Sequence, residues 1–298
     1  MHSSARSRFN LIGMRSQAAL TVTPVIARGP GAWDHERMLS LAIRAGPRLV
    51  GPLAVLLLWH LAATLGWVDP HFVPAPLTVL KTLQEWMFGA AAGMPYSGTW
   101  FLHAGNSAYR VFGGFAIAAV VGVALGSLIG WFRLVSDLLD PIIQMMRPVP
   151  ITAWVPFAVI FFGIRDGSAL FLIALGAFFP IVVNTAAGVA GTPRLLVRAG
   201  RMLGIRPYML LPRVVLPAAM PFIFTGLRLG IGLAWVLVIV AEMLAVKSGL
   251  GFAMWDAYYF LRMDIIIAAM LSVGVLGFLS DLAIRLVGRW VLRWSRGL

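Results

Sequence analysis

The sequence predicts an all-α polytopic membrane protein with about six transmembrane helices, because of its composition, its hydropathy and the lengths of its apolar segments. Of the 298 residues, 60% are hydrophobic and only 12% are charged, and the mean hydropathy is +0.89. In a soluble domain about a quarter of the residues are charged, so this chain has too little polar surface to cover itself in water. A spanning helix needs about 20 apolar residues, and the chain has room for several.

The chain is expected to consist of a disordered cytoplasmic N-terminal tail, residues 1–46, and a transmembrane domain, residues 47–298. The tail is rich in Arg, Ser, Gly and Pro and lacks the apolar core of a signal peptide. A second methionine, Met38, lies shortly before the first apolar segment. One hypothesis is therefore that translation starts at Met38 rather than at Met1.

Six apolar segments follow the tail, and each is expected to form a spanning helix. They cover residues 49–67, 111–132, 141–164, 168–190, 218–246 and 265–287. The second segment contains glycines that would allow close helix packing, and the third contains prolines that predict a break. Between the first two segments, the apolar residues of 77–88 recur at helical spacing, which predicts a short helix lying on the membrane surface.

The basic residues predict the orientation of the chain. With both termini inside, the segments 133–140 and 192–217 and the C-terminus lie in the cytoplasm, and they hold most of the 24 basic residues. This agrees with the positive-inside rule. The formal charge of +13 then reflects topology and contact with anionic membrane lipid, so no nucleic acid is expected as a partner.

The sequence contains no motif of a known enzyme class. It lacks a GxxxxGK[ST] phosphate loop, HExxH and GxSxG, and its five histidines do not have metal-ligand spacing. It also has no cysteines, which excludes disulfides and thiolate metal sites. Neither a metal nor a cofactor is therefore expected in this chain.

The segment 192–217 is too polar to span a membrane, but it contains several helix signals. Residues 195–203 can form a short helix that Gly204 ends, and Pro207 can begin a second helix. The pattern predicts a compact helix-turn-helix on the cytoplasmic face. A plain basic loop that only obeys the positive-inside rule is the alternative.

This segment resembles the EAA loop of ATP-binding-cassette (ABC) importer permeases, in which EAA is followed by three residues, Gly, nine residues and Ile-x-Leu-Pro. The matching positions here are Arg198, Ala199, Gly200, Gly204, Leu216 and Pro217. The resemblance implies that the loop docks on an ATPase. Arg198 replaces the glutamate of the pattern, which reverses a charge at a docking surface. Gly200 weakens the helix by up to about 1 kcal/mol relative to Ala.

Other stretches resemble the nitrate/sulfonate/taurine group of this family. They are residues 72–76, 107–115, 140–141, 147–156, 178–180, 225–228, 241–244, 249–251 and 255–257. The resemblance implies a permease that forms a homodimer and takes nitrate, a sulfonate or taurine as its substrate. It also implies two cytoplasmic ATPase subunits, which hydrolyse the ATP, and a periplasmic or lipid-anchored substrate-binding protein.

Three polar residues in the predicted spans are candidates for the translocation path: Asn184, Arg228 and Glu242. A charge at the bilayer centre costs about 2.5–3.5 kcal/mol on insertion scales. Arg228 is either an electropositive site for an anion or a structural donor to backbone carbonyls. Glu242 could pair with Lys247 or contact loops that receive a binding protein. Asn184 could line the path or satisfy backbone freed by Pro180.

Two other classes of function were weighed against a permease of an ABC importer. A secondary transporter, driven by an ion gradient, predicts internal repeats and broken helices with acidic ion ligands, but the sequence shows no repeat and few acids in its apolar segments. A membrane-embedded enzyme needs a cluster of His, Asp, Glu or Ser, and none is visible.

Asp281 and Arg285, four residues apart, are expected to form a simple ion pair.

Overall fold

The computed structural model describes residues 50–89 and 96–293. Every secondary-structure element in these two ranges is helical, which confirms the predicted fold class. The chain divides into two units, residues 1–55 and 56–298, and the boundary falls within the helix Val50–Thr64. The predicted tail and the alternative start at Met38 lie outside the described residues.

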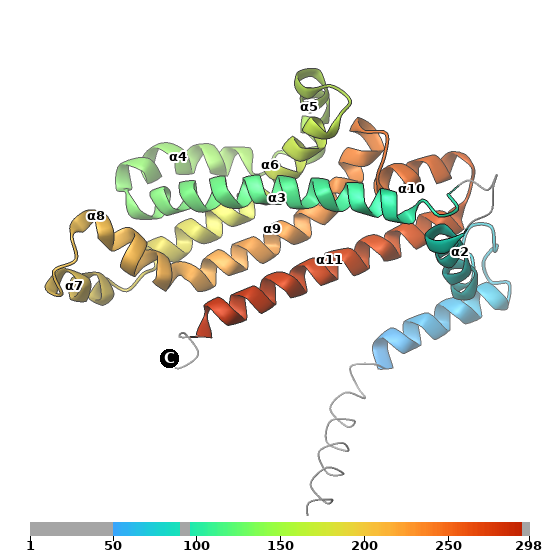
Figure 1. Cartoon of the computed structure of the whole chain (residues 1–298), viewed down its shortest axis with the longest axis horizontal. Coiled ribbons are helices and arrows are strands. Elements are labelled where there is room, and N and C mark those ends of the chain that lie inside the picture. Colours follow the sequence, from blue (N-terminus) through green and yellow to red (C-terminus); the bar gives the residue numbers. More distant parts are fainter. Residues whose placement is uncertain (1–49, 90–95, 294–298) are drawn as a thin grey trace, which may run out of the picture. The chain divides into compact units, whose positions relative to one another are not determined.

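Four helices of the second unit are long and apolar enough to cross a membrane. They are α3 (Trp100–Trp131), α6 (Asp166–Ala190), α9 (Leu216–Ala245) and α11 (Met263–Val291), and Figure 1 shows them side by side. A bent helix pair could provide a fifth span. The helix Val50–Thr64 is shorter than the roughly 20 residues that a span needs. Of the six predicted spans, the described residues therefore show four, or five with the bent pair.

Close packing of α6 between α3 and α9 forms the centre of this unit. Four glycines bring α3 against α6, because a Cβ at any of them would lie 2.6–2.9 Å from an α6 atom; they are Gly114, Gly122, Gly126 and Gly130. The predicted role of these glycines is confirmed. On the other side, Gly226 and Gly230 of α9 approach α6 in the same way. Ile181 of α6 is fully buried between the two neighbours.

The third predicted span is a broken helix pair. The helix α4 (Arg133–Met146) ends before Pro148, and a 3₁₀ turn (Ile151–Trp154) leads into α5 (Val155–Phe162) with a bend of 93°. The predicted break is confirmed. Residues 133–140, which lie between the second and third predicted spans, are helical and form the first turns of α4. An ion pair between Arg133 and Asp137 at 3.9 Å has the i,i+4 spacing that supports a helix.

Different short helices lie at the two ends of the long helices. The segment with α7 (Arg194–Met202) and α8 (Pro207–Leu210) lies at one end, called here the loop end, and α2 (Pro76–Phe88) and α10 (Leu250–Tyr259) lie at the other, the far end (Figure 1). The helix predicted over 77–88 is confirmed as α2. The structure adds α10, which lies between the fifth and sixth predicted spans. Small residues of α10, Ala253 and Ala257, are fully buried in a core with α2 and α11.

Candidate functional site

The segment between α6 and α9 folds as the predicted helix-turn-helix. Gly204 has φ +80°, a conformation that glycine adopts without strain, and its N–H donates to the Arg201 carbonyl at 3.0 Å. The N–H of Ile205 donates to the Gly200 carbonyl at 3.1 Å. These two bonds are a Schellman motif, which ends α7 at the predicted residue. Pro207 then begins α8, so the alternative of a plain basic loop is wrong.

The inner side of this segment packs on the start of α9. Gly200 is buried, and a Cβ there would lie 3.2 Å from both Leu210 and Val214. Leu210 and Val215 are fully buried. A π-helical stretch, Leu211–Val215, joins α8 to α9 without a break in the helical path. The segment therefore forms one packed body with α9, and Gly200 is a position of close packing.

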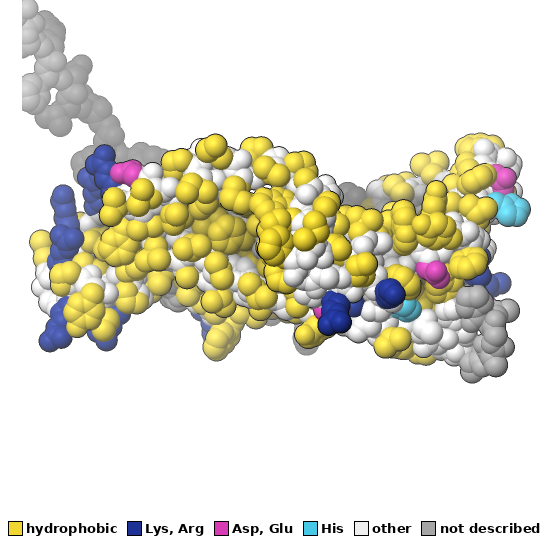
Figure 2. Space-filling view, turned by 90° about the horizontal axis from the view of Figure 1, so that it is seen from above, with side chains coloured by type: hydrophobic (Ala, Val, Ile, Leu, Met, Phe, Trp, Pro, Cys, Tyr) yellow, Lys and Arg dark blue, Asp and Glu magenta, His cyan; other side chains and the backbone are white. Residues whose placement is uncertain are grey.

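The outer side of α7 is an apolar strip without a partner in the described residues. Leu195, Met202 and Leu203 expose 75%, 87% and 82% of their surface, and with the exposed Ala199 they have the i, i+4, i+7, i+8 spacing of one helix face. Along one edge of the strip the helical spacing places three basic residues, Arg194, Arg198 and Arg201, and Arg206 follows shortly after the helix. Figure 2 shows basic side chains gathered at this end of the helices. An exposed apolar patch with a polar border is typical of an interaction surface.

A buried ion pair joins the helices at the far end. Glu242 of α9 is completely buried, and Arg110 of α3 exposes only 4% of its side chain. Arg110 Nη1 donates to Glu242 Oε1 at 2.8 Å, while the Ser107 hydroxyl and the Gly251 N–H both donate to Oε2 at 2.9 Å. The predicted pairing of Glu242 with Lys247 is wrong. In this structure the Glu242 carboxylate is enclosed by donors of the chain itself.

Arg110 also ties α3 to two further segments. Its Nε donates to Asp166 in the first turn of α6 at 2.7 Å. Its Nη1 and Nη2 donate to the carbonyl and hydroxyl oxygens of Ser248 at 2.7 Å each. Sequence reasoning placed Arg110 near the membrane surface and gave it no role. In the sequence, a role for Arg110 was indicated by its position in the stretch 107–115, which resembles the nitrate/sulfonate/taurine group.

The stretch 249–251 fits around the Glu242 carboxylate. Gly249 has φ +117°, and a Cβ there would collide with that carboxylate. At Gly251 a Cβ would lie 2.6 Å from the Ile239 carbonyl oxygen. The intervening Leu250 N–H donates to Ser107 at 2.8 Å. Two glycines are therefore needed for the backbone to reach the ion pair.

Replacing Gly249 with Ala is expected to lower the amount of folded protein severely. The new methyl group must displace Glu242 from its hydrogen bonds, and φ +117° is strained for any residue with a Cβ. The measurement is the monodisperse fraction of detergent-solubilised protein in size-exclusion chromatography. Gly105→Ala is the matched control, because a Cβ on that α3 residue meets nothing within 4 Å. A Gly249→Ala protein that is as abundant and monodisperse as the control would contradict this account.

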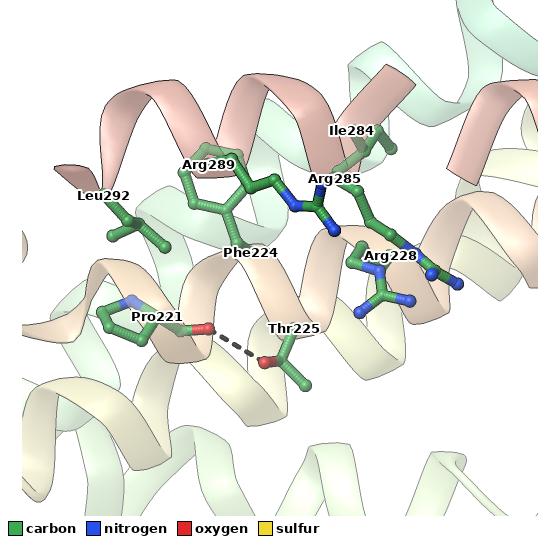
Figure 3. Close-up of a pocket in the computed structure, with 9 residues that line it drawn as sticks. Pro221, Phe224, Thr225, Arg228, Ile284, Arg285, Arg289 and Leu292 are labelled. Atoms are coloured by element: carbon green, nitrogen blue, oxygen red, sulfur yellow. Dashed lines mark hydrogen bonds between the residues drawn. The ribbon is translucent and has the colours of Figure 1, made fainter. Parts of the chain in front are cut away.

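Arg228 and Asn184 do not lie with Glu242 in one site. Arg228 Nε donates to Asp281 of α11 at 2.8 Å, so its partner is a carboxylate rather than the backbone carbonyls that were expected. The predicted pair of Asp281 with Arg285 is confirmed at 2.6 Å. Asn184 donates to the Pro180 carbonyl at 2.8 Å, so its amide is used within α6. Arg228, which exposes 42% of its side chain, lies beside a cavity shown in Figure 3.

Comparison with known proteins agrees with this arrangement. Residues 118–293 match the family model "Binding-protein-dependent transport system inner membrane component". The chain is 35% identical to a putative aliphatic sulfonates transport permease of Bacillus subtilis, over 94% of this chain and 98% of that one. It is 35% identical to the taurine transport system permease of Escherichia coli, over 88% and 92%. It is 44% identical to the nitrate import permease of Synechocystis, over 58% and 62%.

A solved structure has the same fold. The MetNI methionine ABC transporter, in inward-facing conformations, matches 66% of this chain and 99% of the compared chain with a TM-score of 0.59 and 18% identity. The family match covers more than half of the chain, and the relatives match over nearly their full length. The chain therefore belongs to the family of binding-protein-dependent inner-membrane transport components, as a permease subunit of an ABC importer in the nitrate/sulfonate/taurine group.

Proposed function

We propose that two copies of this chain form the membrane path of an importer for a small anion, and that two separate ATPase subunits drive it through the α7–α8 segment. A substrate-binding protein, periplasmic or lipid-anchored, delivers the anion at the far end. The chain itself is not an enzyme and needs no cofactor. The single observation that supports this proposal best is the exposed apolar strip on α7 with its basic border.

Docking of the ATPase follows from the chemistry of that strip. Burying an apolar side chain of this size stabilises a complex by about 1.5–3 kcal/mol, and Leu195, Met202 and Leu203 are almost fully available for burial. The arginines beside the strip favour a partner with acidic residues along one edge of an apolar groove. Arg198, in place of the glutamate of the family pattern, favours an acid at its contact on the ATPase, since unlike charges attract.

Movement of the ATPase would reach the far end through α9. The loop segment packs on the start of α9 through Leu210 and Val215, so the two move as one body. The helix then continues from Leu216 to Ala245. Glu242 is about 39 Å from Leu216 at a rise of 1.5 Å per residue. A displacement at the loop end therefore acts directly on the Arg110–Glu242 pair.

The proposal also includes the orientation of the chain in the membrane and the class of its substrate. The loop end, where the basic side chains gather (Figure 2), is cytoplasmic by the positive-inside rule, and both termini are cytoplasmic. The relatives named above are transport permeases for sulfonates, taurine and nitrate, so a small oxyanion or organic anion is the proposed substrate. Of the three path candidates, Arg228 remains the one with an exposed charged group.

The docking proposal predicts that Arg198→Glu weakens association with the cognate ATPase. A glutamate there would face the acid that now pairs with Arg198, so like charges would oppose each other. The measurement is the amount of ATPase that copurifies with the permease from membranes, at 50 mM and at 500 mM salt. Arg133→Gln is the control, because Arg133 lies on α4 outside the α7–α8 segment. Equal or greater copurification of ATPase by the Arg198→Glu protein would contradict an acidic contact at this position.

A further inference from the structure

Three arginines line a cavity between α9 and α11. The cavity has a volume of about 450 Å³. Arg228 comes from α9, while Arg285 and Arg289 come from α11, and Figure 3 shows the three guanidinium groups on the same side of the two helices. Apolar side chains complete the lining, among them Phe224, Ile284 and Leu292. The site therefore combines a concentrated positive charge with an apolar wall.

The charges of this cavity are not balanced within the described residues. Asp281 accepts from Arg228 at 2.8 Å and from Arg285 at 2.6 Å. Arg289 has no ion-pair partner in the described part of the chain, so three positive groups share one carboxylate. All three arginines are exposed, so their excess positive charge repels itself and is accessible from outside the chain. An anion from outside the chain would offset this repulsion.

The free donors of the arginines suit an oxyanion. Arg228 and Arg285 each use Nε and Nη2 for Asp281, which leaves Nη1 of both residues and the whole guanidinium of Arg289. Guanidinium groups bind phosphate and sulfonate oxygens with paired N–H donors. We propose that this cavity is a binding site for a phosphate-type or sulfonate-type oxyanion group.

Such a group has two sources, the headgroup of an anionic phospholipid and a free organic anion. Arg289 is two residues from the end of α11, so the cavity lies at the end of this helix that the positive-inside rule places on the cytoplasmic side. Basic pockets between transmembrane helices on the cytoplasmic side bind such headgroups. The apolar wall of Phe224 and Leu292 fits the glycerol and acyl carbons of a lipid, so the lipid is the favoured source. The inference goes beyond the proposed function, since binding needs neither ATPase nor transport.

The test compares the intact protein with the double variant Arg285→Gln/Arg289→Gln, which keeps Arg228 paired with Asp281. Each protein is purified with dioleoyl-phosphatidylglycerol or dioleoyl-phosphatidylcholine, and retained lipid is counted by native mass spectrometry. In a second arm, the lipid-depleted protein is titrated with ethanesulfonate and its thermal unfolding is followed. Arg133→Gln, which removes an exposed arginine of α4, is the matched control.

We expect the unmodified protein and the control to retain phosphatidylglycerol in preference to phosphatidylcholine, and each lost arginine to weaken binding roughly tenfold. Stabilisation by ethanesulfonate that the double variant loses would also support the site, with a free anion as its occupant. If the double variant does not fold, Arg289→Gln replaces it, because that residue has no ion pair to break in the described residues. Lipid retention and ethanesulfonate response that are the same in the variant and in the unmodified protein would overturn the inference.

Discussion

Replacing Arg110 with Met is expected to remove most of the folded protein from the membrane. The substitution leaves the carboxylate of Glu242 fully buried with only the Ser107 hydroxyl and the Gly251 N–H as donors. Removing one partner of a buried ion pair costs about 3–5 kcal/mol, which is a large share of the roughly 5–15 kcal/mol that stabilises a typical fold. The measurement is membrane abundance together with the midpoint of thermal unfolding in detergent.

A second substitution distinguishes the cost of leaving the Glu242 charge unpaired from the cost of losing the Arg110 side chain. Adding Glu242→Gln to Arg110→Met removes the charge and keeps an oxygen that can accept from Ser107 and Gly251, so we expect abundance and unfolding midpoint to recover substantially. Lys247→Met is the control, because Lys247 is exposed and makes no bond to Glu242 among the described contacts. Normal abundance of Arg110→Met, or a double variant that is no better than the single one, would contradict a structural role for the pair.

Replacing Leu203 with Asp is expected to abolish coupling to the ATPase without loss of the permease. Leu203 exposes 82% of its surface, so the folded chain tolerates a polar group there. A carboxylate would have to be desolvated in the apolar groove of the partner and would face the proposed acidic edge. The expected result is loss of substrate-stimulated ATP hydrolysis in the reconstituted complex, at normal permease abundance.

Leu203→Met is the matched control for this prediction, since it keeps an apolar side chain of similar size. We expect the Leu203→Met complex to keep substrate-stimulated ATP hydrolysis, because volume-conserving apolar changes usually cost less than about 1.5 kcal/mol. Full substrate-stimulated ATP hydrolysis in the Leu203→Asp complex would show that the apolar strip of α7 is not the docking surface.

The α7–α8 segment could be predicted from the sequence because its signals are local. Gly204 and Pro207 each specify a backbone conformation by their own chemistry, and both act where the sequence pattern placed them. The break of the third span followed from its prolines for the same reason. The glycines of α3 predicted close helix packing, but only the structure shows that α6 is the partner.

The two ion-pair clusters could not be predicted, because their partners are far apart in the chain. Arg110 and Glu242 are separated by 132 residues, and Arg228 and Asp281 by 53. A search for pairs along one helix face finds Asp281 with Arg285 but not contacts between helices. The start of α3 was misplaced for a related reason. Polar residues of its first turns, such as Ser107 and Arg110, lower the local hydropathy although they are buried.

The helix α10 was missed because its stability comes from contacts with other segments. It has ten residues, and isolated helices shorter than about 12–15 residues are marginal in water. Its buried face, including Leu250 and Ala253, packs in the core that α2 and α11 share. The N–H groups of Leu250 and Gly251, which donate to Ser107 and Glu242, fix its first turn on the ion pair at the far end. None of these contacts has a local signature.

Site-specific crosslinking tests the central claim, that a separate ATPase docks on α7, most directly. The chain has no cysteines, so Met202→Cys introduces a single thiol on the exposed strip, and Lys81→Cys places one on α2 at the far end as the control. Membranes that also contain the cognate ATPase are treated with a short thiol-to-amine crosslinker, and the products are identified by mass spectrometry. The account predicts an ATPase adduct with Met202→Cys, at a yield that changes on ATP addition, and none with Lys81→Cys. An active complex in which Met202→Cys gives no ATPase adduct would contradict it.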